Sequence, residues 1–201
     1  MLFGISGAQG AGKSTILTNL PPYIPVDNFK VSRHVQKQFG WDSLTNVMND
    51  FETMVKFQMA VYETKLQHDL DLNITNPFGF TFTERTFADI WAYSSLWADS
   101  FYEKDNSLLS DIIGFKMDML RFCEQAQNEI YTDVFLLPRM AHIIDENDPN
   151  RASKETADIV YDAIHKFSTS VHVRSPWHEI TSPSVEGRVQ EVLSALKVYG
   201  V

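Results

Sequence analysis

The fold of this chain is decided by the stretch Gly7-Ala8-Gln9-Gly10-Ala11-Gly12-Lys13-Ser14, which satisfies the pattern G-x-x-x-x-G-K-[ST] in full. An apolar run at residues 2–6 precedes it and indicates a buried parallel strand. Residues 13–20 follow with helical composition and stop at Pro21-Pro22. The pattern indicates a functional loop only when it lies between a strand and a helix, and both elements are expected here. The sequence therefore predicts a phosphate-binding loop.

Such a loop binds phosphate through its backbone. Glycines let successive N–H groups point into one concavity, and the N-terminus of the next helix adds its dipole. Lys13 can reach the β and γ oxygens of a nucleoside triphosphate, and the Ser14 hydroxyl can ligate Mg²⁺. Thr15 either touches the α-phosphate or is plain helix surface. We therefore expect ATP and Mg²⁺ as cofactors, and the predicted binding residues are Gly7, Ala8, Gln9, Gly10, Ala11, Gly12, Lys13, Ser14 and Thr15.

Short apolar runs alternate with helical stretches along the whole chain. Strands are expected at residues 2–6, 23–26, 78–83, 133–137 and 170–173, and helices at 13–20, 31–70 (with a break at Gly40), 86–99, 105–128, 154–167 and 185–198, with a turn at 73–77. Strands separated by helices imply right-handed βαβ units. We predict an α/β fold with a five-stranded parallel sheet, helices on both faces and a small lid at about 139–153. The length of 201 residues fits one such domain, spanning 1–201.

The chain is acidic and has a single cysteine. The formal net charge of −9 argues against nucleic-acid binding without excluding it, because Lys30, Arg33 and Lys37 form a weak basic strip. Cys123 alone rules out an intrachain disulfide, and its apolar helical surroundings predict a buried, inert thiol. No apolar run approaches the ~20 residues that span a bilayer. We expect a protein of the reducing cytoplasm (the host cytoplasm if the chain is viral) with no membrane partner.

Two carboxylates follow predicted strands at the sheet edge where open α/β folds bind ligands. Asp27 could accept a proton from an acceptor hydroxyl or hold Mg²⁺ through water, but Asp27-Asn28 equally suits a turn. Glu84 would emerge beside the phosphates, where a carboxylate organises the Mg²⁺ shell or acts as general base. The alternative for Glu84 is a salt bridge with a neighbouring arginine. The sequence leaves open which of the two is the base.

Cationic side chains complete the predicted site. Arg85 is expected near the acceptor or the transferred phosphoryl group, and Asp89 is expected to cap or brace the following helix. The polar loop at 139–151 either closes over ATP and neutralises charge or is ordinary surface, and Arg151 is a better candidate than Arg139 because it opens the next helix. The predicted catalytic residues are Lys13, Asp27, Glu84, Arg85 and Arg151, and the predicted metal ligands are Ser14 and Glu84.

Further motifs carry a family resemblance. Residues 84–93 read E-R-T-F-A-D-I-W-A-Y, residues 134–138 read V-F-L-L-P, and Glu186-Gly187-Arg188 forms a late E-x-R. With the phosphate-binding loop, these resemble the small P-loop kinase-like ATPases that include the ribosylnicotinamide kinase domain of bifunctional bacterial NAD-biosynthesis regulators, and many phage proteins. The family pattern D-R-S-x-x-D-x-x-A-Y has Asp where Glu84 stands, and Lys30 lies near a position that is usually Glu. The resemblance implies a P-loop NTPase fold of the nucleoside/nucleotide kinase type and an ATP-dependent phosphotransferase.

Three functions compete at this point. The favoured one is a kinase for a nucleoside, nucleotide or related small hydroxyl compound, with an aromatic acceptor pocket. A phage-type DNA kinase that phosphorylates 5-hydroxymethyl-pyrimidine would accept a flipped base. An ATP-hydrolysing switch without an acceptor would need an arginine from a neighbour, and a homodimer stays open as the oligomeric state. Aromatic side chains that could line the pocket, although their helical spacing also suits core packing, are Phe57, Phe87, Trp91, Tyr93 and Trp97.

Overall fold

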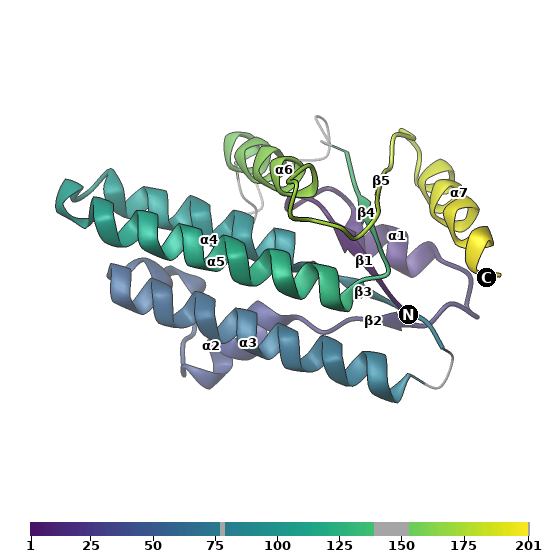
Figure 1. Ribbon diagram of the computed structural model, residues 1–201, viewed down its shortest axis with the longest axis horizontal. Coiled ribbons are helices and arrows are strands. Elements are labelled where there is room, and N and C mark those ends of the chain that lie inside the picture. Colours follow the sequence, from purple (N-terminus) through teal and green to yellow (C-terminus); the bar gives the residue numbers. More distant parts are fainter. Residues whose placement is uncertain (77–78, 139–152, 201) are drawn as a thin grey trace.

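A parallel β-sheet forms the centre of the molecule. In the computed structural model, residues 1–76, 79–138 and 153–200 are described, and within them the sheet has five strands in the order β2-β3-β1-β4-β5 (Figure 1). Every neighbouring pair is parallel. The predicted five-stranded parallel sheet is therefore confirmed. The strands are β1 (Leu2–Ser6), β2 (Val26–Asp27), β3 (Thr81–Glu84), β4 (Asp133–Leu136) and β5 (Trp177–Glu179).

Helices cover both faces of the sheet, as expected for βαβ units. One face packs on α1 and α7, where Ile16 and Val192 meet Phe3, Ile5 and other strand residues of the same apolar cluster. The opposite face packs on α3, α4, α5 and α6 (Figure 1). The helices are α1 (Lys13–Asn19), α2 (Val31–Gln38), α3 (Phe51–Thr75), α4 (Phe87–Tyr102), α5 (Leu109–Ile130), α6 (Lys154–Ser168) and α7 (Val185–Leu196).

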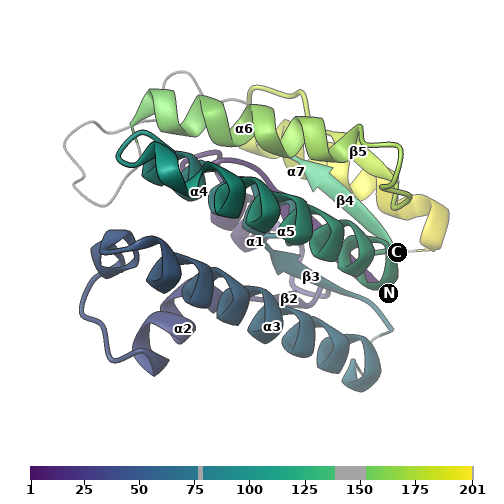
Figure 2. The same ribbon diagram turned by 60° about the vertical axis from the view of Figure 1, so that its left-hand side comes forward.

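The long helices α3, α4 and α5 extend past the sheet. Figures 1 and 2 both show α4 and α5 running side by side, with one end well beyond the strands. Asn73, near the C-terminal end of α3, donates to the carbonyl of Ile130 just before β4 starts. Lys65, eight residues before Asn73 on α3, contacts Thr83 near the end of β3. The first turns of α3 therefore project beyond the carboxyl edge of the sheet.

Several predicted elements differ from the observed ones, among them the third strand, which was expected at 78–83 and lies at Thr81–Glu84, and the helical stretch 31–70, which is interrupted between Gln38 and Phe51. The last strand was expected at 170–173, but Val173 N–H closes a turn on the Ser170 carbonyl, and Val171 is 90% exposed. The strand that pairs with β4 is β5, because Val134 and Leu136 align with Trp177 and Glu179. The expected turn at 73–77 is wrong at its start because α3 continues to Thr75. The second strand is also shorter and later than predicted, at Val26–Asp27.

Two expectations drawn from composition can be compared with the structure. The thiol of Cys123 is fully buried, and burial raises its pKa well above the ordinary value, so the predicted buried thiol is confirmed. No helix in the described part of the chain is long and apolar enough to cross a membrane. The predicted lid at about 139–153 lies almost entirely outside the described residues.

A buried ion pair ties α3 to the sheet. The Lys65 ammonium lies 2.9 Å from Asp69 Oδ1 and 2.8 Å from Thr83 Oγ1, and both partners of the pair are fully buried. Tyr131 O–H donates to the other Asp69 oxygen at 2.5 Å. Because each charge has a partner, the desolvation cost of burying the two is offset within the cluster. Removing one partner would leave an uncompensated buried charge.

We predict that Lys65→Met lowers the free energy of unfolding by about 3–5 kcal/mol, because Asp69 is left as an unpaired buried charge. The double variant Lys65→Met/Asp69→Asn should recover part of this loss, since no net charge then remains buried. Urea denaturation of both variants measures the difference. Lys56→Met, which breaks the exposed pair with Glu52, is the control and should leave stability unchanged. A Lys65→Met variant as stable as this control would contradict the prediction.

Candidate active site

The segments predicted to bind phosphate and metal meet at the carboxyl edge of the sheet. Ile5 of β1 aligns with Glu84 of β3, and Thr83 aligns with Asp27 of β2. The loop after β1 therefore lies next to the residues that end β3 and β2. Ligands of open α/β folds bind at this edge. The sequence correctly predicted that these side chains converge here.

The glycines of the loop have backbone conformations that other residues rarely adopt. Gly10 has φ of 84° and Gly12 has φ of 90°, both in the left-handed region. No atom lies within 4 Å of a Cβ built on Gly10, so the need for glycine there is conformational. Gly12 is the N-cap of α1, and the helix starts at Lys13. The loop thus leads directly into the N-terminus of α1, while the N–H groups of Gly7 and Ala11 are engaged by Asp89 and by the Ala8 carbonyl.

Lys13 folds back over the loop. Its ammonium donates to the carbonyls of Gly7 and Ala8, the latter at 2.9 Å, and lies 3.9 Å from Asp89 Oδ1. Burial lowers the pKa of Lys13 to about 8, against the opposing charge of Asp89. A phosphate anion near this amine would favour its charged form. The position is therefore electrostatically prepared for an anionic ligand.

Ser14 and Lys30 both donate to one carboxylate oxygen of Glu84. Ser14 Oγ donates to Glu84 Oε2 at 2.9 Å, and the Lys30 ammonium donates to the same oxygen. Burial alone would raise the pKa of Glu84, but the hydrogen bonds from Lys30 and Ser14 hold it below its ordinary value. Glu84 is therefore ionised at neutral pH. A salt bridge at this position was the expected alternative role, although with a neighbouring arginine as the partner.

The pair of Ser14 and Glu84 fits Mg²⁺. Both groups offer hard oxygen donors, and Mg²⁺ in such sites takes one or two protein oxygens and completes its shell with water and phosphate. Among the described residues there is no group of three or more His, Cys, Asp or Glu side chains that could hold a metal ion alone. The donor set thus suits a metal that arrives with a phosphate ligand.

Asp27 is held by three donors. His68 Nε2 lies 3.0 Å from Asp27 Oδ2, Thr83 Oγ1 donates to that oxygen at 3.4 Å, and the N–H of Phe29 donates to it at 3.3 Å. The Phe29 contact is the turn role that the sequence allowed. His68 was not foreseen, because its approach depends on how α3 packs against β2. Its ring lies on that of Phe29, with centroids 4.2 Å apart.

Arg85 is the one residue other than glycine with positive φ in the described part of the chain, at 65°. Its N–H donates to the Ile5 carbonyl at 3.0 Å, which extends the pairing of β1 with β3. The guanidinium lies 5.3 Å from the centre of the Tyr93 ring. Such backbone strain is typical of functional sites, where the surrounding structure maintains it. The ladder and the stacking on Tyr93 together hold the cation at the sheet edge.

Asp89 connects the loop with α4. Its carboxylate accepts from the N–H of Thr86 at 2.9 Å and completes a capping box at the helix start, as expected. Ser6 Oγ also donates to it at 2.7 Å, and the N–H of Gly7 donates at 3.4 Å. The sequence predicted the cap but not these contacts across the sheet edge.

Arg188 braces the loop from the other side. The side chain is buried, and it donates to the carbonyl of Ser182 at 2.8 Å and to that of Ala11 at 3.4 Å. Glu191, one turn further along α7, accepts from the N–H groups of Thr181 and Ser182. The family resemblance indicated Arg188 without giving it a role. Its contacts now place α7 and the segment before it against the loop.

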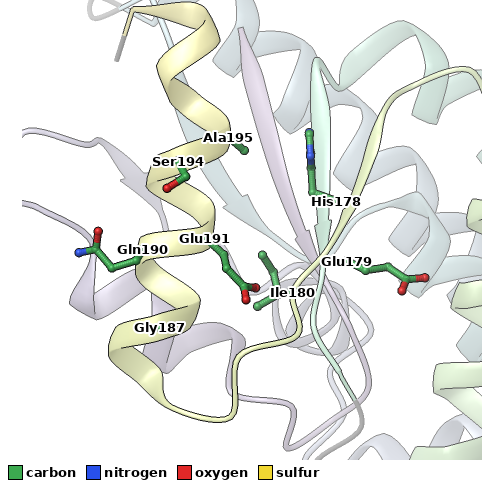
Figure 3. A pocket seen from close by; sticks show the side chains of 8 residues that line it. All are labelled: His178, Glu179, Ile180, Gly187, Gln190, Glu191, Ser194 and Ala195. Atoms are coloured by element: carbon green, nitrogen blue, oxygen red, sulfur yellow. The ribbon is translucent and has the colours of Figure 1, made fainter.

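A separate cavity lies between β5 and α7 (Figure 3). Its volume is about 370 Å³, and Glu179 extends away from α7 in this view. None of its lining residues belongs to the phosphate-binding loop or to the group around Glu84. The cavity is lined by His178, Glu179, Ile180, Gly187, Gln190, Glu191, Ser194 and Ala195.

The aromatic residues proposed for an acceptor pocket fall into two groups. Phe87 packs against Tyr131 in the core, and the Trp91 ring packs on Phe167 of α6. The second group forms a chain of ring contacts from Phe57 through Trp97 to Tyr93, whose other neighbour is the Arg85 guanidinium. Trp41, which the sequence did not single out, stacks on Phe57 at 5.4 Å. Arg151 and Arg139 lie outside the described residues.

No protein-family model and no curated protein sequence matches the chain. Solved structures do match its fold. A deoxyadenosine kinase from M. mycoides, with bound dCMP and dCDP, has a TM-score of 0.63 and 14% identity over 98% of this chain and 100% of that one. A thymidylate kinase from Candida albicans has a TM-score of 0.60 and 14% identity over 99% and 92%.

The NadR protein in complex with NR has a TM-score of 0.65 and 12% identity over 100% of this chain and 52% of that one. The chain thus spans about half the length of the NadR chain. At identities of 12–14% these likenesses concern the fold. The fold of this chain is therefore similar to the folds of these kinase structures.

Proposed function

We propose that this protein is an ATP-dependent kinase that transfers the γ-phosphoryl group to a hydroxyl or phosphate of a nucleoside- or nucleotide-type acceptor. The observation that carries the proposal is the convergence, at one edge of the sheet, of the phosphate-binding loop, the Ser14–Glu84 pair and the strained Arg85. Phosphoryl transfer depends mainly on positioning and on charge stabilisation, and these groups supply both. The likeness to nucleoside and nucleotide kinases supports the same reading.

Ser14 and Glu84 are the residues that would hold Mg²⁺ together with the ATP phosphates. When bound, the metal would neutralise charge on the phosphates. The Lys13 ammonium now donates to the Gly7 and Ala8 carbonyls. It would exchange these hydrogen bonds for hydrogen bonds to phosphate oxygens. Arg85 would neutralise charge on the transferred group from the acceptor side. The predicted part of Arg151 in a lid belongs to the same proposal.

We assign the role of base to Asp27. Glu84 is a weak proton acceptor, because two hydrogen bonds already stabilise its ionised form and lower its pKa. Asp27 ends the neighbouring strand, and its contacts with His68, Thr83 and Phe29, at 3.0–3.4 Å, all fall on Oδ2, so that Oδ1 would face the acceptor hydroxyl. Its carboxylate would orient the acceptor hydroxyl and accept its proton. This assignment leaves Glu84 to the metal.

The acceptor is expected between α3 and α4, beyond the sheet edge. Gln58 is buried and lies seven residues before Lys65 on α3, so at 1.5 Å per residue it sits about 10 Å past the level of Thr83. Phe57, its neighbour, begins the ring contacts that lead to Tyr93 and Arg85. A buried amide can hydrogen-bond a base edge in two places, and flat rings can stack on its faces. This combination suits a nucleobase.

An acceptor screen tests the proposal. Purified protein with Mg²⁺ and ATP should release ADP slowly alone and faster with one or more nucleosides or nucleoside monophosphates, and the phosphorylated product should appear in equal amount. Lys13→Ala should abolish turnover because phosphate binding is lost. Stimulation by 5-hydroxymethylated DNA alone would favour the DNA kinase, and unstimulated turnover would favour the hydrolysing switch; either result would overturn the small-acceptor proposal.

The two carboxylates should differ in their kinetic effects. Asp27→Asn is expected to lower kcat about 10²–10⁴-fold at saturating Mg²⁺ and ATP, because the acceptor proton loses its base. Glu84→Gln should instead raise the Mg²⁺ concentration needed for half-maximal rate. Steady-state kinetics over a Mg²⁺ series separates the two effects, with denaturation curves to verify folding. If Glu84→Gln caused the larger kcat loss at saturating Mg²⁺, the two roles would be exchanged.

Nucleotide binding should take up a proton above pH 8. The pKa of Lys13 is lowered to about 8 by burial, and bound phosphates would raise it again by favouring the ammonium. At pH 7 the amine is already charged, so little proton uptake is expected. At pH 9 most of one proton should be taken up, and affinity should fall as pH rises. Calorimetry in two buffers of different ionisation enthalpy measures this, and pH-independent binding without uptake would contradict the predicted role of Lys13.

A further inference from the structure

One oxygen of Glu84 serves two donors that come from distant parts of the chain. Ser14 reaches Glu84 Oε2 from the first turn of α1, and Lys30 reaches it from the N-cap of α2. The pair of Lys30 and Glu84 is asymmetric in exposure: the lysine side chain is 44% exposed and the carboxylate only 9%. The carboxylate is therefore fixed and shielded, while the cation beside it faces solvent.

The backbone of Lys30 is anchored although its side chain is exposed. Its carbonyl accepts the N–H of His34 at 3.0 Å, which is the first hydrogen bond of α2. From this fixed point the four-carbon side chain can rotate away from Glu84 without moving the helix. Lysine ammonium groups are hydrated point charges on flexible stems, and half-exposed lysine pairs are weak. The contact with Glu84 can thus be exchanged for solvent at small cost.

Ser14 Oγ and the Glu84 carboxylate are also the two oxygens that fit a divalent cation. The Lys30 ammonium occupies a lone pair of that carboxylate, next to the Ser14 hydroxyl. Two cations on the same oxygen repel each other strongly at this separation. A divalent ion can bind this Glu84 oxygen without that repulsion only after the Lys30 ammonium has moved away.

We propose that Lys30 is a tethered competitor of the divalent cation at Glu84: it neutralises this carboxylate in the absence of metal and is displaced when metal binds. The inference rests on the metal role given to Ser14 and Glu84 in the proposed function. The chain thereby keeps a buried, ionised carboxylate paired in the nucleotide-free protein. It also weakens binding of the bare metal ion relative to metal that arrives already bound to phosphate.

Binding of Mn²⁺ to the nucleotide-free protein tests the inference without any assay of activity. Lys30→Met should bind Mn²⁺ about three- to tenfold more tightly than the wild type in a titration followed by electron paramagnetic resonance. Lys37→Met is the matched control: it removes the same charge from an exposed position on the same helix and should leave Mn²⁺ affinity unchanged. Lys30→Met/Glu84→Gln should lose the gain, because the carboxylate oxygen is gone.

Lysine signals give a second readout in the wild type. After reductive ¹³C-methylation, which retains the positive charge, the Lys30 resonance (identified by its absence in Lys30→Met) should move toward the position of exposed lysines when Mg²⁺ is added. In Glu84→Gln it should already lie there and not respond. A Lys30→Met variant that binds Mn²⁺ no more tightly than Lys37→Met, or a Lys30 signal unaffected by Mg²⁺, would overturn the inference.

The outcome is distinguishable from failure of the proposed function. If no acceptor is phosphorylated while Mn²⁺ affinity and the Lys30 signal respond as described, the kinase proposal fails and the role of Lys30 stands. If phosphoryl transfer occurs and Lys30→Met leaves Mn²⁺ affinity unchanged, the kinase proposal stands and the competition is refuted.

Discussion

The carboxylate of Asp89 is the contact on which the arrangement of the site depends. It is 1% exposed, and five groups surround it: the Ser6 hydroxyl, the N–H of Gly7, the N–H and the hydroxyl of Thr86 and, further away, the Lys13 ammonium. These groups belong to the end of β1, the phosphate-binding loop and the start of α4. A single buried charge with this many donors fixes three segments relative to one another, because leaving any donor unpaired is costly.

A second series of buried polar contacts leads from the core to the same edge of the sheet. Tyr131 donates to Asp69, Asp69 pairs with Lys65, and Lys65 donates to Thr83. Since the Thr83 oxygen accepts from an ammonium, its single proton is directed to Asp27. The position of Asp27 is thus coupled, through Lys65 and Asp69 of α3, to Tyr131 just before β4. Arg188 supplies the equivalent support for the loop at Ala11 from α7.

Much of this organisation could be predicted from the sequence, for physical reasons. Central strands such as β1 and β4 are buried on both faces, so they appear as continuous apolar runs. The phosphate-binding loop has its own pattern, and Glu84 is the last residue of β3, whose register with β1 brings it beside Ser14. These predictions use only local composition and the rule that parallel strands end at one edge.

The remainder depends on packing that a local pattern does not contain. His68 and Asp27 are 41 residues apart, and they meet because α3 packs beside the end of β2. Lys30 and Glu84 are 54 residues apart and meet through the turn that precedes α2. The edge strand β5 was missed because Trp177, His178 and Glu179 do not form an apolar run, and pairing with β4, not composition, makes this segment a strand. Contacts between side chains distant in sequence were therefore found only in the structure.

The lengths of the outer strands limit how copies of this chain can associate. The sheet ends on one side with β2, which has two residues, and on the other with β5, which has three. Such short edge strands present few unpaired N–H and C=O groups to another chain, and Glu179 adds a charged side chain to the edge strand β5. Among the residues that the structure describes, edge-to-edge pairing of two such sheets into a continuous intermolecular sheet is therefore disfavoured.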